Sequence, residues 1–233
     1  MPESCILYYI TDRKAFSGDE QSRRRRLLEK IAEAAGAGID YVQLREKDLC
    51  TKDLEFLARE AIQIIRAQNK LRNENPGLTT ALLINSRTDV ALAAGADGVH
   101  LTADDLSPKE VREIWKSARS RDASAAARET LQREPLISVS CHSSQEVVQA
   151  ASNLSGLALF APVFEKKDIP GTAVAGLEGL RQACRANIPV LALGGISLET
   201  AGACLLAGAA GIAAIRLFQE NAISSIARTL RGY

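Results

Sequence analysis

Short apolar runs alternate with longer amphipathic segments along the whole chain. The runs have the length of buried strands and lie at residues 5–10, 40–44, 81–84, 97–101, 136–140, 157–160, 189–193 and 211–215. Between them apolar residues recur at helical spacing, as at Leu54, Leu57, Ala58 and Ala61. This α/β alternation predicts a parallel sheet, and its eight strands favour a closed (β/α)8 TIM barrel. An open doubly wound sheet is the alternative, but no G-x-G-x-x-G follows an early strand.

The alternation predicts a single TIM-barrel domain over residues 1–233. Two polar, aperiodic stretches interrupt it near residues 68–80 and 118–135. Each is expected to follow a helix and precede a strand, which places it at the end of the barrel opposite the strand C-termini. We therefore predict two tolerated and mobile insertions away from the functional face.

Charge and hydropathy exclude several classes of partner. Lys and Arg total 29 against 28 Asp and Glu, so the net charge of +1 gives no general attraction to nucleic acid or to an anionic membrane. The arginine run 23–26 lacks an aromatic platform and is interpreted as the solvated start of a helix. The longest run of small apolar residues, 201–215, is broken by glycine and is shorter than a membrane span. We expect neither a nucleic-acid nor a membrane partner.

The five cysteines are widely spaced, odd in number and form no C-x-x-C pair. This spacing argues against a disulfide framework and against a thiolate zinc site. The N-terminus has no basic region followed by a long apolar stretch. These features predict a cytoplasmic protein, and they are compatible with a homo-oligomer.

The stretch Q-L-R-E-K places an amide and two cations at alternate positions where the second strand ends. Strand side chains alternate with period two, so Gln43, Arg45 and Lys47 can face the barrel mouth while the apolar residues beside them face the helices. The planar fork of arginine and the point charge of lysine together suit a phosphate or pyrophosphate. The alternative interpretation is a surface ion-pair network with Glu46 and Asp48.

Histidine and carboxylate residues mark the ends of the fourth and fifth strands. His100 is followed by an acidic pair that ends in Asp105, and Ser140 and His142 alternate at the end of the fifth strand. Histidine exchanges a proton near neutral pH, and clustered carboxylates hold a magnesium ion that bridges phosphate oxygens. Taken singly, each histidine fits a packing role equally well, and Asp105 fits the N-cap of a helix at 107–118.

A glycine pair, Gly194 and Gly195, follows the seventh strand. Glycines there let backbone N–H groups approach an anion at the start of a helix, and the loops after strands seven and eight often form the phosphate site of such barrels. The same pair also serves simply to turn the chain.

Seven stretches follow one another along the chain in this order: YYITD, YVQLREKD, LLINSRTDVALAAGADGVHL, DD, VSCHS, PVF and PVLALGGIS. Together they resemble thiamine phosphate synthases and TenI-like thiazole tautomerases over residues 7–217. The resemblance implies a (β/α)8 barrel. For a synthase it implies coupling of hydroxymethylpyrimidine pyrophosphate with hydroxyethylthiazole phosphate and release of pyrophosphate.

The resemblance also implies a dissociative route. Magnesium and protein cations stabilise the leaving pyrophosphate, and the thiazole nitrogen attacks a pyrimidine cation. The implied roles are pyrophosphate binding by Gln43, Arg45 and Lys47 with help from Asn85, magnesium ligation by Asp105, a lining role for Ser140, and thiazole-phosphate contacts from Gly195 and Ile215.

The chain departs from the synthase pattern in four places. Ser86 stands where an aspartate ligand is expected, and Thr102 and Ala103 replace a G-Q pair. The T-x-T-K element corresponds to residues 165–168, which read E-K-K-D, and Arg216 replaces a serine.

Two enzymatic interpretations follow from these departures. In the first, Lys166 or Lys167 and Arg216 supply cationic charge by another route, and a magnesium-dependent synthase activity is retained. In the second, the chain is a TenI-like tautomerase that moves a proton on a thiazole carboxylate phosphate without a metal, with His142 as acid and base. The intact Q-R-K triplet favours the synthase. A non-catalytic barrel that binds phosphate esters is a third hypothesis.

Overall fold

The computed structural model describes residues 5–72, 79–119, 133–165, 171 and 173–232. Eight parallel strands close into a barrel, each beside its neighbours in chain order, with β1 against β8. The strands are β1 (Ile6–Ile10), β2 (Tyr41–Leu44), β3 (Ala81–Asn85), β4 (Gly98–Leu101), β5 (Leu136–Cys141), β6 (Leu157–Phe160), β7 (Val190–Ala192) and β8 (Gly211–Ala214). The predicted (β/α)8 TIM barrel is confirmed.

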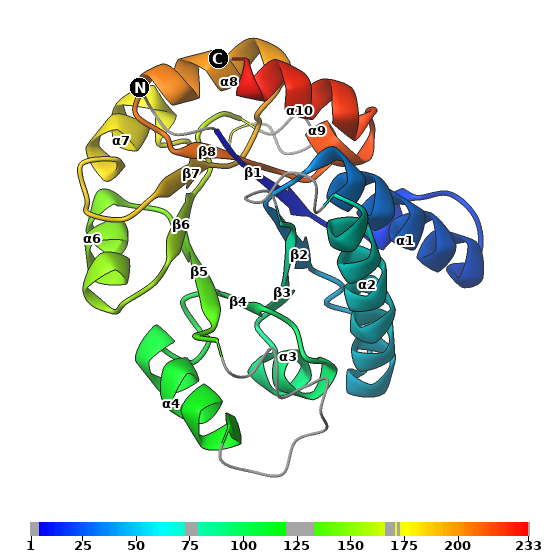
Figure 1. Cartoon of the computed structure of the whole chain (residues 1–233). Helices are drawn as coiled ribbons and strands as arrows, with labels where there is room; N and C mark the ends of the chain where they lie inside the picture. Colours follow the sequence, from blue (N-terminus) through cyan, green and yellow to red (C-terminus); the bar gives the residue numbers. More distant parts are fainter. Residues whose placement is uncertain (1–4, 73–78, 120–132, 166–170, 172, 233) are drawn as a thin grey trace.

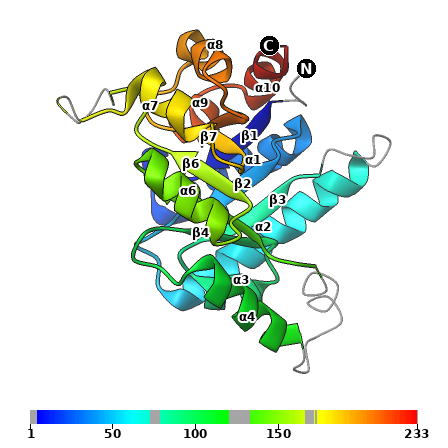
Figure 2. The same cartoon turned by 90° about the vertical axis from the view of Figure 1, so that its left-hand side faces the viewer.

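Helices surround the strand ring, as Figures 1 and 2 show from two directions. They are η1 (Arg13–Ala15), α1 (Glu20–Ala37), α2 (Thr51–Leu71), α3 (Thr88–Ala94), α4 (Pro108–Arg119), α6 (Ser144–Ser152), α7 (Gly176–Ala183), α8 (Leu198–Leu206), α9 (Arg216–Gln219) and α10 (Ile223–Arg231). Each strand leads into the helical layer at its C-terminal end, so the loops that leave the strands gather at one end of the barrel.

Successive strand residues point to opposite sides of the barrel wall. Val42 and Leu44 belong to the large core between strands and helices, whereas Tyr8 belongs to a small apolar core inside the barrel. Gln43 is the register partner of Ile10, another residue of the inner core, and is 1% exposed. The predicted alternation in β2 is therefore confirmed, and it turns the amide of Gln43 inward.

Both predicted insertions connect a helix with the N-terminal end of a strand. The first joins α2 to β3 and the second joins α4 to β5. Helix α2 continues to Leu71, so the first insertion begins as helix rather than loop. The side chain of Asn69 exchanges two hydrogen bonds with the backbone of Thr80, at 3.0 and 2.9 Å, which ties the helix end to the start of β3. Residues 73–78 and 120–132, and the mobility predicted for them, lie outside the described residues.

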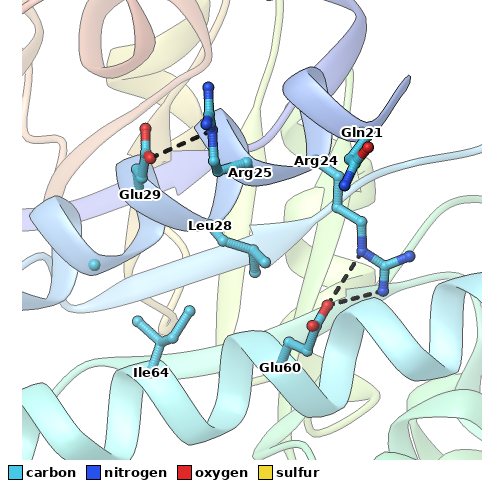
Figure 3. Close-up of a pocket in the computed structure, with 8 residues that line it drawn as sticks. Gln21, Arg24, Arg25, Leu28, Glu29, Glu60 and Ile64 are labelled. Carbon is cyan, nitrogen blue, oxygen red and sulfur yellow. Dashed lines mark hydrogen bonds and ion pairs between the residues drawn. The ribbon is translucent and has the colours of Figure 1, made fainter. Parts of the chain in front are cut away.

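The arginine run of α1 is engaged within the protein. Arg24 donates to Glu60 of α2 at 2.8 Å, and Arg25 lies 3.7 Å from Glu29 (Figure 3). Arg24 also stacks on the ring of Phe56. A cavity of about 390 Å³ lies among these side chains, lined by α1 and α2 in the outer helical layer. It contains none of the predicted site residues.

Two further predictions concern the cysteines and the membrane. All five cysteines are free thiols in the structure. Among the described residues, no helix is both long and apolar enough to cross a membrane.

Candidate active site

The C-terminal ends of β2 to β5 bring the predicted polar residues together. In register, Asn85 at the end of β3 lies beside His100 of β4, and His100 lies beside Ser138 of β5. Gln43 Nε2 donates to Asn85 Oδ1 at 2.7 Å. Ser140 follows two residues after Ser138 on the same side of β5 and hydrogen-bonds His100 at 2.9 Å. Four neighbouring strands thus contribute to one polar wall.

Asp105 is fixed at this wall by three hydrogen bonds to a single oxygen. Ser86 Oγ donates to Asp105 Oδ2 at 2.7 Å, and Thr102 donates to the same atom through its backbone N–H at 2.7 Å and its hydroxyl at 2.9 Å. Across the described ranges, no residue hydrogen-bonds to Oδ1. One carboxylate oxygen therefore stays open to a ligand.

The alternative role of Asp105 as a helix N-cap is wrong. Helix α4 is capped by Ser107, whose backbone N–H donates to Glu110 Oε2 at 2.8 Å and whose hydroxyl accepts from the backbone of Glu110 at 3.3 Å. This reciprocal arrangement satisfies the first turn of the helix. The Asp105 carboxylate is left for the barrel mouth.

Ser86 occupies the position where the resemblance expects a second aspartate. Its φ is 61°, a left-handed conformation that costs a non-glycine residue about 1–2 kcal/mol. The backbone N–H of Ser86 donates to His100 O at 2.8 Å, and its hydroxyl accepts from Asn85 Nδ2 at 2.9 Å. The chain thus keeps a strained turn at this point and uses it to orient a hydroxyl toward Asp105 instead of supplying another carboxylate.

The acidic neighbours of the two site cations are held by Arg13, a residue that the sequence analysis did not single out. Arg13 donates to both oxygens of Asp48 at 2.7 Å and to Glu46 Oε2 at 3.1 Å. We call these three residues the acid clamp. In the part of the chain that the structure describes, Arg45 and Lys47 form no ion pair. The predicted ion-pair network exists, but it forms without the two cations.

The clamp is buried at its centre. Arg13 and Glu46 are 3% and 4% exposed, and Thr11 Oγ1 donates to Glu46 Oε1 at 2.6 Å. Burial raises the pKa of Glu46, and the hydrogen bonds from Thr11 and Arg13 oppose that rise. The Arg13 guanidinium holds the pKa of Asp48 well below its usual range. The alternating R-E-K-D signs after β2, together with D-R after β1, were the sequence signal for this clamp.

His100 is a neutral, buried member of the site. It is 3% exposed, and its pKa is lowered to about 4, mainly by burial; Asp105 opposes this shift, and Arg45 and Lys47 add to it. The imidazole is therefore uncharged at neutral pH. The charges of Asp105, Arg45 and Lys47 all lie near enough to the imidazole to act on its pKa.

His142 stands at the rim rather than in the wall. Its side chain is exposed, and its Nδ1–H donates to the backbone carbonyl of Ala161 at 2.7 Å. A carbonyl oxygen only accepts, so the neutral ring carries its lone pair on Nε2. The backbone N–H of His142 donates to Glu146 at 2.8 Å. The ring is thus oriented with an available basic nitrogen at the end of β5.

The glycine pair after β7 has left-handed backbone, with φ of 93° at Gly194 and 67° at Gly195. A Cβ at Gly195 would lie 2.6 Å from the backbone oxygen of Glu165, so both conformation and close approach require glycine. The backbone N–H groups of Gly195 and Ile196 donate to no other described residue. The turn and the phosphate-site interpretations are therefore compatible.

The remaining predicted residues lie at the far side of the mouth or outside the described residues. Ile215 follows β8 and is partly buried, and Arg216 begins α9 with an exposed side chain. Lys166 and Lys167 lie outside the described residues. No cluster of three or more His, Cys, Asp or Glu side chains suited to a metal occurs among the residues described here.

Comparisons with known proteins agree over nearly the whole chain. The family model described as thiamine monophosphate synthase matches residues 7–120 and 118–218. A thiamine-phosphate synthase of Syntrophomonas wolfei is 34% identical over 230 residues, covering 97% of this chain and 94% of that protein. A thiamine-phosphate synthase of Azorhizobium caulinodans is 33% identical over 237 residues, covering 99% of this chain and 95% of that protein.

The fold comparison points to the same proteins. The solved structure of thiamine phosphate pyrophosphorylase from Pyrococcus furiosus matches with a TM-score of 0.73 at 26% identity, covering 97% of this chain and 94% of that one. The (S)-3-O-geranylgeranylglyceryl phosphate synthase of Thermoplasma acidophilum, at 16% identity and a TM-score of 0.61, shares the fold alone. The chain therefore belongs to the thiamine monophosphate synthase family.

Proposed function

We propose that this chain is a thiamine-phosphate synthase, a transferase of thiamine biosynthesis. Its substrates would be hydroxymethylpyrimidine pyrophosphate and hydroxyethylthiazole phosphate. The observation that carries the proposal is the pair of cations at the end of β2, Arg45 and Lys47, whose acidic neighbours are withdrawn into the acid clamp. Cations at a barrel mouth that form no ion pair with another described residue suit the charge of a leaving pyrophosphate.

The proposed reaction needs stabilisation of that leaving group above all. The bond between the pyrimidine methylene carbon and the pyrophosphate oxygen breaks, and its electron pair stays on the pyrophosphate. The thiazole nitrogen then gives its lone pair to the methylene carbon and forms the new C–N bond. Arg45 and Lys47 would stabilise the charge that grows on the departing oxygens, and Gln43 and Asn85 would orient them.

The donor set fits a magnesium ion of the phosphate-bound kind. Asp105 has one oxygen without a protein partner, and the buried Gln43 Oε1 accepts no hydrogen bond within the described chain. Magnesium commonly binds through one or two carboxylates together with water and substrate phosphates, so a single aspartate suffices. Asp105 would hold the ion, with Ser86 fixing the carboxylate. Bound there, magnesium would neutralise charge on the pyrophosphate.

The free Nε2 of His142 supports a second candidate function. A rim histidine with a fixed tautomer and an available lone pair suits proton transfer on a thiazole ring, which is the chemistry of a TenI-like tautomerase. Such a reaction releases no pyrophosphate and so needs no cationic pair to stabilise a leaving group, and for that reason we place this function second.

Purified protein with both synthase substrates and magnesium chloride tests the proposal. Release of pyrophosphate that is strongly reduced in Arg45→Ala but retained in the surface variant Arg25→Ala would support it. Proton exchange on the thiazole carboxylate phosphate without pyrophosphate release would replace it with the tautomerase. Binding of phosphate esters without either reaction would favour the non-catalytic barrel.

A further inference from the structure

A network of four hydrogen-bonded side chains runs from the closed interior of the barrel to its mouth. Tyr8 Oη lies 2.9 Å from Ser138 Oγ, Ser138 Oγ lies 2.9 Å from His100 Nδ1, and His100 Nε2 lies 2.9 Å from Ser140 Oγ. Tyr8 and Ser138 are fully buried, and Ser140 is partly exposed. The network therefore has one end that is buried away from water and one end that is open to ligand.

The number of polar hydrogens in this network determines the direction in which its hydrogen bonds run. The three hydroxyls and the neutral imidazole carry one polar hydrogen each, and three bonds join them. One hydrogen is therefore left over. Among the described residues, Tyr8 Oη and Ser138 Oγ have no hydrogen-bond partner other than the members of this network. Tyr8 packs in an apolar core with Leu159 and Leu191.

The tautomer of His100 decides where the surplus hydrogen goes. With the hydrogen on Nδ1, the ring donates to Ser138, and the surplus lies on Ser138 or Tyr8 in the dry interior. With the hydrogen on Nε2, Tyr8 donates to Ser138, Ser138 donates to Nδ1, and the ring donates to Ser140. The surplus is then the hydroxyl hydrogen of Ser140, at the mouth. A buried polar hydrogen without an acceptor is costly, so the second arrangement is favoured.

We propose that the Tyr8–Ser138 pair fixes His100 as its Nε2–H tautomer, so that Ser140 presents its hydroxyl to bound substrate as a hydrogen-bond donor. Ser140 is then the group that contacts ligand, and His100 is a positioning residue that acts through it. The ligand atom opposite Ser140 must be a hydrogen-bond acceptor.

Two isosteric variants separate the positioning role from packing, and this part of the test rests on the proposed synthase function. In His100→Gln the amide nitrogen takes the place of Nε2 and keeps a donor for Ser140, whereas in His100→Asn the amide takes the place of Nδ1 and keeps only the contact with Ser138. We expect His100→Asn to lower kcat roughly tenfold, the scale of one hydrogen bond, with little change in KM. We expect His100→Gln to retain most of the activity.

A double-mutant cycle with Ser140→Ala completes the kinetic test. If His100 acts through Ser140, the loss from Ser140→Ala in the His100→Asn background should be much smaller than in the wild type. Equal losses in His100→Asn and His100→Gln, or additive losses in the cycle, would overturn the positioning role.

The tautomer itself is measurable in the free protein and does not depend on any activity. The chain has two histidines, so a long-range ¹H–¹⁵N spectrum contains two rings, and the His142→Ala variant assigns them. The proposal predicts a protonated Nε2 and an unprotonated Nδ1 for His100 at pH 7. A protonated Nδ1, or an imidazolium ring, would overturn it even in a fully active synthase, and the predicted tautomer in an inactive protein would leave it standing.

Discussion

Arg13→Ala should destabilise the protein strongly, because it removes the centre of the acid clamp. The guanidinium is 3% exposed and donates to Glu46, to both oxygens of Asp48, and to Glu20 at 2.7 Å. Its loss leaves the Glu46 carboxylate, 4% exposed, without a cation. Removing one partner of a buried ion pair costs about 3–5 kcal/mol, and we expect a loss in this range.

The assay is urea unfolding at pH 7, with Arg25→Ala as the matched control. Arg25 also pairs with a glutamate, Glu29, but the two side chains are 70% and 66% exposed. An exposed helical pair contributes only about 0.3–0.5 kcal/mol. A loss in Arg13→Ala no larger than in Arg25→Ala would refute the clamp as a buried unit.

The same variant has a kinetic consequence. Without Arg13, Glu46 and Asp48 become available to pair with Arg45 and Lys47, so the KM for the pyrophosphate substrate should rise. Adding Glu46→Gln and Asp48→Asn to Arg13→Ala removes both acids and should restore that KM. A KM that stays at the wild-type value in Arg13→Ala would show that the clamp does not protect the two cations.

Further predictions concern the leaving group, the metal and the pH dependence. Arg45→Ala should lower synthase turnover by roughly 10²–10³-fold with the circular-dichroism spectrum unchanged, and unaltered turnover would remove Arg45 from the mechanism. Asp105→Asn should raise the magnesium concentration for half-maximal activity by roughly tenfold or more, and an unchanged magnesium titration would exclude Asp105 as the ligand. The pKa of His100 is lowered to about 4 in the folded protein from about 6.5 in the unfolded chain. As the pH falls, the unfolded chain therefore takes up the proton first. The contribution of His100 to stability should be complete above about pH 6.5 and be lost as the pH falls toward 4. Its full size is about 3 kcal/mol, and unfolding of wild type and His100→Gln between pH 4 and 7 measures it: parallel curves would contradict the buried neutral ring.

Much of the fold was predictable because strand period and chain order are local properties. The alternation around Gln43 predicted which residues face the barrel interior, and the eight apolar runs predicted the closed sheet. The first insertion was placed one helical turn too early, because polar residues at the end of α2, such as Asn69, continue the helix while binding the backbone of Thr80.

The site was predictable in its positions and less so in its connections. Arg45, Lys47 and Asp105 were identified from charge at strand ends. The partners of Glu46 and Asp48 were not, since Arg13 lies 33 residues before Glu46 and meets it only when β1 and β2 pair. The role of Asp105 as acceptor from Ser86 was also hidden, because it depends on a left-handed turn that the residue type does not favour.

The central claim is that this chain couples a pyrimidine pyrophosphate to a thiazole phosphate. The most direct measurement is mass-spectrometric detection of thiamine phosphate, together with quantification of pyrophosphate, after incubation of purified protein with both substrates and magnesium. The account predicts one pyrophosphate for each thiamine phosphate formed and strong loss of both products in Arg45→Ala. No thiamine phosphate from folded wild-type protein would contradict it.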